Sequence, residues 1–357
     1  MGLFSRRKRA PTDDPTLVGF GGDAPEEELE EPEPLDLGPE PLEAFEMLVD
    51  REWERLAAPG TWWTGAERIA IAADARRAMA GEALSGILPP PVEEATRIIA
   101  TAAASIRGTD VARWELDGLD ASAYIEIAGI VSRLAALDVT AFGLGHKFRP
   151  LPEPEPGDPS RDRPDGATIT TGWAPTIGPA AASSALSAVP AEAEAMADVR
   201  DVLYLGAVQM LQTQSGRDGL TRPQIELAAS RASALNDCFH CLLGQTSMLH
   251  ETIDAAPGAR TSRPIITGCG DAGVEHGAEI IAFVDSVVLF DDDEVDAARA
   301  ALEHRIGPVA TDRVAMVAGS FSMTSRAVDA IGAPVGRGHD ELADELGVAI
   351  PAHLAPR

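Results

Sequence analysis

Residues 226–245 read E-L-A-A-S-R-A-S-A-L-N-D-C-F-H-C-L-L-G-Q. The first half of this stretch is rich in alanine and leucine, which favour a helix. Asn236 and Asp237 follow, and both residue types are poor in a helix interior but favourable at an N-cap. We therefore predict that one helix ends just before Asn236 and that another begins at Cys238. Cys238 then lies in the first turn, with Cys241 one turn later on the same face.

The spacing of the two cysteines suits redox chemistry. Two thiols three residues apart can close a disulfide once one of them is oxidised. Backbone N–H groups at the start of a helix stabilise anions, so we expect a lowered pKa for the Cys238 thiol. Glu226 lies twelve residues before Cys238, which is ~18 Å along an unbroken helix. A chain reversal at 236–237 would bring this carboxylate to the thiols, where it would accept a proton.

Glu226, eleven intervening residues and a Cys-x-x-Cys pair resemble the signature of the alkylhydroperoxidase D and carboxymuconolactone decarboxylase superfamily. The similarity extends from about residue 43 to 335. The resemblance implies that Cys241 is the peroxidatic thiol, which attacks a hydroperoxide and becomes a sulfenic acid. It implies that Cys238 is the resolving thiol, which closes a disulfide that a dithiol donor later reduces. It also places Glu226 in the proton relay.

The chain departs from the family pattern at its last position. The pattern ends with a histidine four residues after the second cysteine, where this chain has Gln245. An amide is not basic near neutral pH, and the loss of a general base slows a reaction by about 10²–10⁴-fold. His240 and His250 lie off the helical face of Cys241 and are poor substitutes.

Two functions therefore stay open. One is a thiol-dependent, peroxidase-like oxidoreductase that reduces hydroperoxides or exchanges disulfides, with site residues Cys241, Cys238, Glu226 and Gln245. The other is a degenerate, non-catalytic binding or scaffold protein of the same superfamily, in which the cysteines are small buried side chains. A zinc site needs four ligands, and too few lie near the cysteines, so we expect no metal and no cofactor.

Helical signals recur along the chain in two similar sets. Thr64 with Glu67 and Thr221 with Gln224 fit capping boxes before helix-forming runs, and an Ala-Gly pattern recurs later in both sets. Helices are predicted at 67–79, 91–107, 120–143 and 225–235. Together with the resemblance, these signals predict an all-α chain of two similar halves, a duplicated alkylhydroperoxidase D-like helical fold.

Composition predicts the organisation of the chain. The expected parts are a disordered acidic N-terminal tail at 1–40, a helical half without cysteines at 41–148, a Pro-rich linker at 149–170, a half carrying the Cys-x-x-Cys site at 171–335 and a C-terminal tail at 336–357. The N-terminal tail has too little apolar surface to offset the entropy of ordering.

A glycine pattern at 268–273 (G-C-G-D-A-G) matches G-x-G-x-x-G, with Asp291 eighteen residues beyond it. A dinucleotide-binding fingerprint must follow a strand and open a βαβ unit. Only Ile265 and Ile266 precede the pattern, and the apolar residues after it recur at helical spacing. The pattern is therefore interpreted as a loop.

The chain carries 57 acidic and 29 basic residues, a formal net charge of −28. Nucleic acid and anionic membranes are bound largely through Lys and Arg, so neither is an expected partner. The sequence has no apolar run of about 20 residues, and its few cysteines fit a reducing, cytoplasmic setting. The expected partners are a small hydroperoxide or disulfide and a dithiol reductant. The resemblance implies a homo-oligomer, with a trimer favoured.

Overall fold

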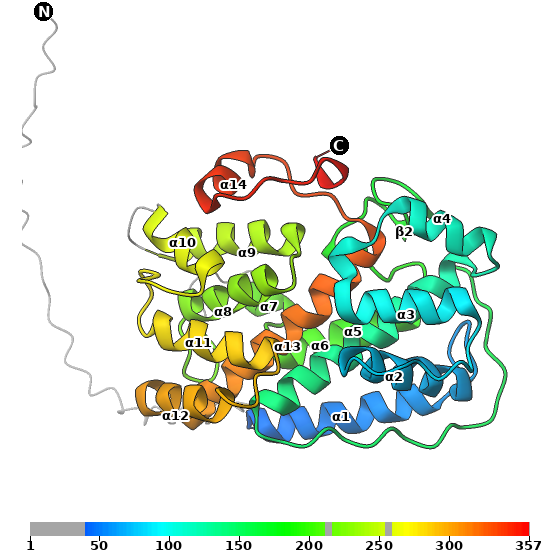
Figure 1. Cartoon of the computed structure of the whole chain (residues 1–357), viewed down its shortest axis with the longest axis horizontal. Helices are drawn as coiled ribbons and strands as arrows, with labels where there is room; N and C mark the ends of the chain where they lie inside the picture. Colours follow the sequence, from blue (N-terminus) through cyan, green and yellow to red (C-terminus); the bar gives the residue numbers. More distant parts are fainter. Residues whose placement is uncertain (1–39, 211–215, 254–258, 357) are drawn as a thin grey trace, which may run out of the picture. The chain divides into compact units, whose positions relative to one another are not determined.

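The long helices α5 (Ala121–Gly143) and α13 (Pro308–Ile331) lie against each other, and the other helices pack around them (Figure 1). The computed structural model describes residues 40–210, 216–253 and 259–356. In these ranges the chain is all-α apart from a ribbon of β1 (Ala167–Thr168) and β2 (Thr176–Ile177). The all-α class predicted from the sequence is confirmed. The predicted disordered tail, apart from its last residue, lies outside the described residues.

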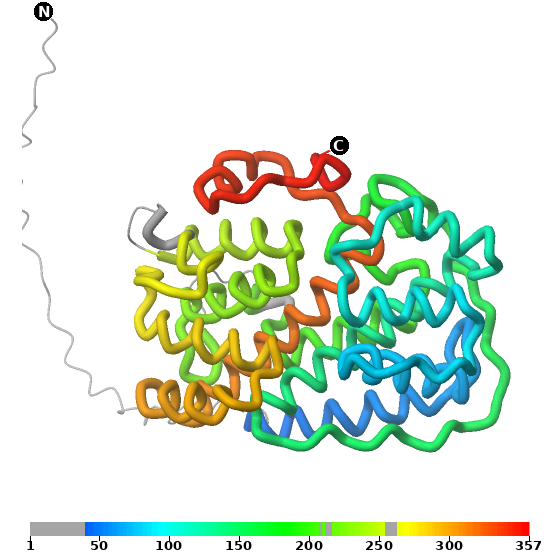
Figure 2. Tube along the Cα trace, viewed as in Figure 1, coloured from blue at the N-terminus to red at the C-terminus, as the bar shows by residue number. Residues whose placement is uncertain are grey.

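Two largely different sets of helices pack around α5 and α13, as the trace in Figure 2 shows. Packed against α5 or its neighbours are α1 (Pro41–Ala57), α2 (Gly65–Met79), α3 (Pro90–Ala102), α4 (Gly108–Leu116) and α6 (Pro190–Leu203). Packed against α13 or its neighbours are α8 (Arg222–Leu235), α9 (Phe239–Thr252), α11 (Gly277–Val288) and α12 (Val295–Ile306). Shorter helices are α7 (Ala207–Met210), α10 (Ala259–Thr267) and α14 (Asp340–Leu346), and 3₁₀ turns occupy Ala103–Ser105, Ala182–Ser184 and Ala352–Leu354.

Both predicted capping boxes are present. The Glu67 carboxylate accepts a hydrogen bond from Thr64 N at 2.9 Å, and Thr64 Oγ1 accepts one from Glu67 N at 3.3 Å. At the second box, the Gln224 side-chain oxygen accepts from Thr221 N at 2.9 Å. These bonds satisfy N–H groups that a helix start leaves unpaired, so the helices begin here. The four predicted helices correspond to α2, α3, α5 and α8, with α3 ending earlier than expected.

Glycines allow α5 and α13 to approach closely. A Cβ atom added to Gly319 of α13 would lie 2.5 Å from the Ala136 carbonyl oxygen and closer still to the Thr140 hydroxyl, both on α5. A Cβ added to Gly143 of α5 would lie 2.7 Å from the Ala315 Cβ on α13. Neither space admits a methyl group, so the two backbones meet at a separation that requires glycine.

The Pro-rich segment predicted as a linker, 149–170, forms an extended strap along the first helix. Its many prolines lack the N–H that a helix needs. Trp53 Nε1 donates to the Pro150 carbonyl oxygen at 2.6 Å, and Glu155 N donates to the Ala57 carbonyl oxygen at 2.8 Å. The strap is therefore fixed to α1 by hydrogen bonds rather than free between two bodies.

The segment predicted as a C-terminal tail, 336–357, folds back onto the helices over its described length. It contains α14, which packs on α9 and α10. Leu346 and Leu354 are buried, and Val335 N donates to the Leu354 carbonyl oxygen at 2.8 Å. This segment therefore belongs to the folded core.

Two expectations concern the chain as a whole. The structure does not show that the two halves are copies of each other, so the duplication stays a prediction. The described residues form a single compact unit, in which the halves share one core. Within the described ranges, no helix has the length and apolar character needed to cross a membrane.

Gly319→Ala is expected to lower the free energy of unfolding by about 1–3 kcal/mol, because a methyl group must be forced into a packed contact. Gly244→Ala is the matched control, since the described atoms leave open space within 4 Å of a Cβ added to Gly244 in α9. There the better helix propensity of alanine should raise stability by about 0.5–1 kcal/mol. Urea denaturation followed by circular dichroism measures both. Equal effects of the two substitutions would contradict a close α5–α13 contact at Gly319.

Candidate functional site

The turn between α8 and α9 positions the two thiols. Asn236 caps the end of α8, and Asp237 has a φ of +56°, a left-handed conformation that redirects the chain. Helix α9 begins one residue after Cys238, so Cys238 is its N-cap rather than a residue of its first turn. Cys238 Sγ accepts a hydrogen bond from Cys241 N at 3.4 Å, and both cysteines are free thiols. The predicted break is confirmed, and it brings the two cysteines together.

The expectation of a lowered pKa at Cys238 is wrong. The thiol is fully buried, and burial raises its pKa well above the ordinary value. The Cys241 thiol adds to this rise, whereas the Cys241 backbone N–H opposes it. A helix N-terminus contributes about 0.3–1 kcal/mol at exposed sites, and removing water from a charge outweighs that effect. Cys241 is also buried, with 3% of its surface exposed.

Glu226 is linked to α9 through Tyr204, the residue that follows α6. The Tyr204 hydroxyl donates to Glu226 Oε1 at 2.7 Å, and it lies 3.2 Å from Gln245 Oε1. Gln245 is one helical turn after Cys241 in α9. A phenol has one proton to donate, so Tyr204 can serve only one of the two oxygens at a time. The structure therefore joins two sequence-predicted site residues, Glu226 and Gln245, by a donor that can switch between them.

Glu226 is fully buried and pairs with Arg222, whose Nε lies 2.5 Å from Glu226 Oε1. Burial raises the pKa of Glu226, against the lowering effects of Tyr204 and Arg222. Its other oxygen, Oε2, has no hydrogen-bond partner in the described part of the chain. The i,i+4 spacing of Arg222 and Glu226 is a sequence signal for this pair. Tyr204, twenty-two residues before Glu226, carries no such signal.

Sequence reasoning also missed Arg326 and Asp329, which α13 brings to the α8–α9 turn. Arg326 Nη1 donates to Asn236 Oδ1 at 2.9 Å, and Nη2 donates to the Ala100 carbonyl oxygen at 3.1 Å. Burial lowers the pKa of Arg326 to about 10, which leaves it charged at neutral pH. Arg326 therefore ties the turn before Cys238 to the end of α3.

Asp329 lies beside the Cys238 thiol, and 5% of its surface is exposed. Burial raises the pKa of Asp329 well above the ordinary value, and the neighbouring Cys238 adds to the rise. Arg326 opposes it. Within the described residues, Asp329 Oδ2 has no hydrogen-bond partner of ordinary geometry. The carboxyl group is therefore positioned to exchange a proton with Cys238.

His240 and Cys269 were also considered from the sequence. His240 Nδ1 is 2.7 Å from the Pro334 carbonyl oxygen, and burial lowers the pKa of His240. Cys269 is exposed in the glycine-containing loop, which follows helix α10 rather than a strand, so the loop interpretation is confirmed. The described residues contain no group of three or more His, Cys, Asp or Glu side chains that could hold a metal ion.

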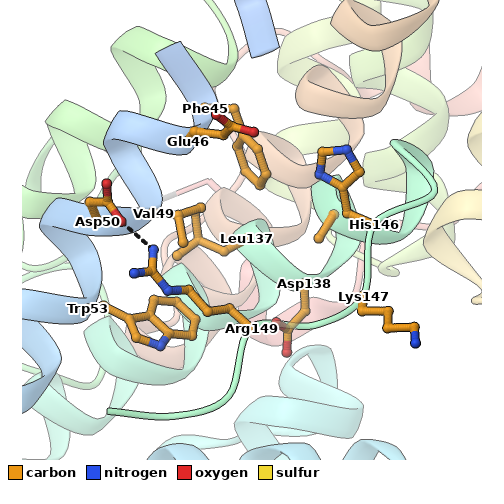
Figure 3. Close-up of a pocket in the computed structure, with 11 residues that line it drawn as sticks. Phe45, Glu46, Val49, Asp50, Trp53, Leu137, Asp138, His146, Lys147 and Arg149 are labelled. Carbon is orange, nitrogen blue, oxygen red and sulfur yellow. Dashed lines mark hydrogen bonds and ion pairs between the residues drawn. The ribbon is translucent and has the colours of Figure 1, made fainter. Parts of the chain in front are cut away.

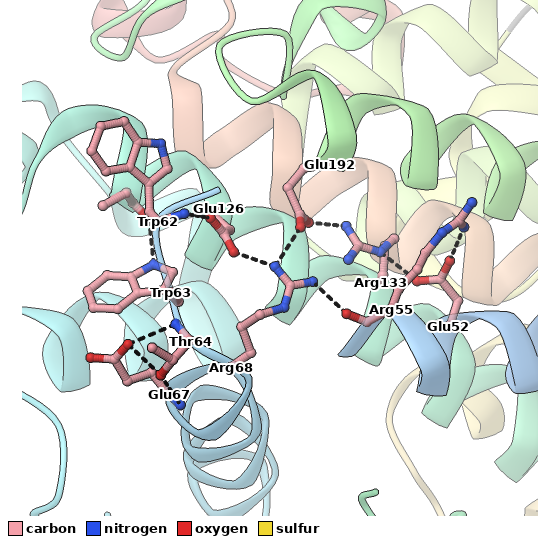
Figure 4. Close-up of polar contacts among 11 residues, drawn as sticks. Glu52, Arg55, Trp62, Trp63, Thr64, Glu67, Arg68, Glu126, Arg133 and Glu192 are labelled. Carbon is pink, nitrogen blue, oxygen red and sulfur yellow. Dashed lines mark hydrogen bonds and ion pairs between the residues drawn. The ribbon is translucent and has the colours of Figure 1, made fainter. Parts of the chain in front are cut away.

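A second set of buried charged groups, here named the buried ion cluster, lies among α1, α2, α5 and α6 (Figure 4). Its members are Glu52, Arg68, Glu126, Arg133 and Glu192, each at most 4% exposed. Arg68 pairs with Glu126 and lies 3.0 Å from Glu192. Arg133 pairs with Glu192 and lies 2.7 Å from Glu52. Burial raises the pKa of Glu126, with a contribution from Glu192. These contacts hold four helices in register.

A cavity of about 300 Å³ lies between α1, α5 and the chain that follows α5 (Figure 3). Phe45 and Trp53 of α1 and Leu137 of α5 form an apolar side, and the polar rim has both signs of charge, with Arg149 paired with Asp50. None of its described lining residues is a cysteine. This cavity therefore takes no part in dithiol chemistry.

The chain was compared with protein-family models, with curated proteins and with solved structures, and none of them matches it. The resemblance to the alkylhydroperoxidase D type therefore rests on Glu226, Cys238, Cys241 and their spacing.

Asp329→Asn is expected to flatten the pH dependence of stability. Because the pKa of Asp329 is raised in the folded protein, the folded state keeps a proton that the unfolded chain releases. The unfolding free energy therefore falls as pH rises from about 4 toward the raised pKa, by about 1.4 kcal/mol per pH unit for one proton. Urea denaturation at a series of pH values should show this fall in the parent and a smaller one in the variant. Parallel profiles would show that Asp329 titrates normally.

Proposed function

We propose that the protein is a thiol-dependent, peroxidase-like oxidoreductase that uses the Cys238–Cys241 pair to reduce hydroperoxides or to exchange disulfides. The observation that carries the proposal is the pair itself: two free thiols at a helix start, with Cys241 N donating to Cys238 Sγ at 3.4 Å. Dithiols in this arrangement cycle between reduced and disulfide forms. The linked Glu226, Tyr204 and Gln245 supply polar groups one turn away.

The overall reaction balances with one external reductant. A hydroperoxide takes two electrons from one thiolate, which becomes a sulfenic acid while the alcohol leaves. The second thiol attacks the sulfenic sulfur, so that a disulfide forms and water leaves. A dithiol reductant then attacks the disulfide, restores both thiols and becomes a disulfide itself. A disulfide substrate would oxidise the pair in the same way and leave as two thiols.

Tyr204 takes part of the role that the missing relay histidine has in the resemblance. Its hydroxyl lies between a buried carboxylate and Gln245, so it can donate toward α9 when Glu226 is protonated and toward Glu226 when that group is ionised. Gln245 has no basic atom, and its amide can donate or accept a hydrogen bond but cannot carry a proton. Tyr204 and Glu226 therefore supply the titratable groups, and Gln245 connects them to α9 by a hydrogen bond alone.

A degenerate, non-catalytic scaffold is the second candidate, and the burial of the thiols favours it. Cys238 is fully buried and Cys241 is 3% exposed, as expected for small apolar side chains in a core. The raised pKa of Cys238 also disfavours the reactive thiolate. In this alternative the pair has no redox cycle, and the helical surface binds another molecule.

The proposal also covers the partners of the protein, its compartment and its oligomeric state. The partners would be a small hydroperoxide or disulfide and a dithiol reductant, in a reducing compartment such as the cytoplasm. The assembly would be a homo-oligomer, with a trimer favoured by the resemblance. Light scattering at micromolar concentration gives the mass, and a monomer would contradict this part of the proposal alone.

The redox cycle is tested by counting thiols in a Cys269→Ser background, because Cys269 is exposed and would react independently. After treatment with cumene hydroperoxide, acid quenching and unfolding, the protein should lose both remaining thiols, and dihydrolipoamide should restore them. The control adds Cys241→Ser, which removes the disulfide and leaves the fold in place. If both thiols of the folded parent stay reduced at millimolar hydroperoxide and also with a small disulfide, the scaffold alternative is correct.

Gln245→His is expected to accelerate turnover with hydroperoxide. The imidazole would lie one turn from Cys241 and near the Tyr204 hydroxyl, which is 3.2 Å from the present Gln245 side chain. An imidazole titrates near neutral pH and can accept a thiol proton. A well-placed general base accelerates a reaction by about 10²–10⁴-fold, so we expect the rate to rise by at least about tenfold. In a Cys241→Ser background the same substitution should give no gain. An unchanged rate in the parent would show that proton transfer at Cys241 does not limit the cycle.

A further inference from the structure

A cavity of about 590 Å³ lies against the α8–α9 turn. Its walls come from five separate segments: residues 100–107, the turn itself, the end of α11, the last turns of α13 and the 3₁₀ turn near the C-terminus. Its charged, amide and imidazole wall groups are Arg107, Asn236, Asp237, Arg326, Asp329 and His353. Its volume falls within the usual range for small organic ligands, about 300–1,000 Å³. We refer to it as the α13 cavity.

The α13 cavity approaches Cys238 more closely than Cys241. Asp237 and Phe239, the residues on either side of Cys238, both line it. Asp329 also lines it, and its carboxyl lies beside the Cys238 thiol. Cys238 itself is fully buried and does not line the cavity, so a bound molecule reaches the sulfur only when side chains of the wall beside it, Asp329 among them, move.

Asp329 differs from the carboxyl groups of the buried ion cluster and from Asp74. The buried ion cluster pairs each of its carboxylates with an arginine, and Asp74, which has no ion pair among the described residues, accepts hydrogen bonds from Ser85 N and Oγ. Within the described ranges Asp329 forms no ion pair, and its Oδ2 has no hydrogen-bond partner. Nearby Arg326 directs its N–H groups to Asn236 and to backbone carbonyls instead. Burying a carboxyl group without such a partner costs stability, so its presence beside the thiol calls for an explanation.

Resting on the dithiol function proposed above, we infer that the α13 cavity binds an organic molecule with an S–S or O–O bond, that Cys238 attacks it, and that Asp329 carries the proton. This assignment reverses the roles that the family resemblance gives to the two cysteines. Cys241 becomes the thiol that closes the disulfide, and the Tyr204 relay serves that second step.

The step balances without a further reactant when the substrate is a disulfide. The Asp329 carboxylate takes the proton of Cys238, and the thiolate attacks one sulfur of the substrate. The substrate S–S bond breaks, a Cys238–substrate disulfide forms, and the leaving thiolate takes the proton back from Asp329. Cys241 then attacks Cys238 and releases the second substrate thiol. With a hydroperoxide, the O–O bond breaks instead, Cys238 becomes a sulfenic acid, and the leaving alkoxide takes the Asp329 proton.

Burial suits Asp329 to this exchange. It raises the pKa of the carboxyl group well above the ordinary range, which makes the carboxylate a stronger base toward a thiol. The charged or titratable groups that face Asp329 are Cys238, Arg326 and Asp237, and Arg107 and His353 lie elsewhere in the cavity wall. Attack should therefore become faster as pH rises through the pKa of Asp329.

Single-thiol variants test which cysteine attacks. In a Cys269→Ser background, Cys241→Ser leaves Cys238 alone and Cys238→Ser leaves Cys241 alone. An aromatic disulfide reagent whose released thiolate absorbs visible light reports attack without turnover. The variant that keeps Cys238 should react with this reagent at least about tenfold faster than the variant that keeps Cys241. With cumene hydroperoxide and a reagent that traps sulfenic acid, the Cys238 variant should again be the faster of the two. A faster reaction at Cys241 would overturn the inference.

Asp329→Asn tests the proton carrier. In the variant that keeps Cys238, Asp329→Asn should slow the reaction by about 10²-fold or more. It should also remove the rise of the rate with pH that Asp329 causes. Asp329→Glu should recover part of the rate and part of its dependence on pH. Circular dichroism and urea denaturation verify that each variant is folded. An unchanged pH profile in a folded Asp329→Asn protein would exclude this role.

A pair of alanine substitutions tests the access route. Ala102 is exposed and lines the α13 cavity, whereas Ala83 is exposed and does not line it. Ala102→Trp should slow the reaction of Cys238 at least about fivefold, and Ala83→Trp should leave it unchanged. Equal rates would show that the substrate does not use this cavity. The parent protein separates the two proposals, because reversible loss of two thiols supports the dithiol function even if Cys241 attacks first.

Discussion

Gly319 of α13 faces the Ala136 carbonyl and the Thr140 side chain of α5, with no room for a methyl group between them. Most helices of the first half pack on α5, most helices of the second half pack on α13, and α6 contacts both, so this contact unites the two halves in one core. The same contact also determines where two side chains near the thiols lie. The last turns of α13 carry Arg326 and Asp329 to the α8–α9 turn, so a shift of α13 against α5 would move both side chains away from the thiols.

An interior rich in alanine and poor in aromatic side chains leaves room for charged groups, and this protein uses that room in two ways. The buried ion cluster matches carboxylates with guanidinium groups, and removing one partner from such a set costs about 3–5 kcal/mol. The set adds little net stability over apolar side chains, but it specifies how α1, α2, α5 and α6 align. Asp329 is the contrasting case, because its carboxyl group is buried beside a thiol, and the nearby Arg326 donates its hydrogen bonds to Asn236 and to backbone carbonyls.

Local signals in the sequence were sufficient for the helices, their capping boxes and the break at 236–237, because each depends on residues within one or two turns. They also singled out the two cysteines, Glu226 and Gln245, but not the hydroxyl that links Glu226 to Gln245. They did not identify Tyr204, which lies 22 residues before its partner Glu226, or Asp329, which lies 91 residues after Cys238. Only tertiary packing brings these two side chains to the site. The direction of the Cys238 pKa was missed for the same reason, since burial is a tertiary property.

The wall at 100–107 belongs to the half of the chain that has no cysteine, and Arg326 reaches from the thiol-bearing turn to that wall. A fragment that began after the strap would keep both thiols, Tyr204 and Glu226. It would nevertheless lose one side of the cavity, leave the Arg326 donors toward Ala100 unmet and expose the face of α13 that α5 covers. Neither half is therefore an autonomous module. A gene split at the strap would yield a working site only by fragment complementation, in which both polypeptides associate before the core can form.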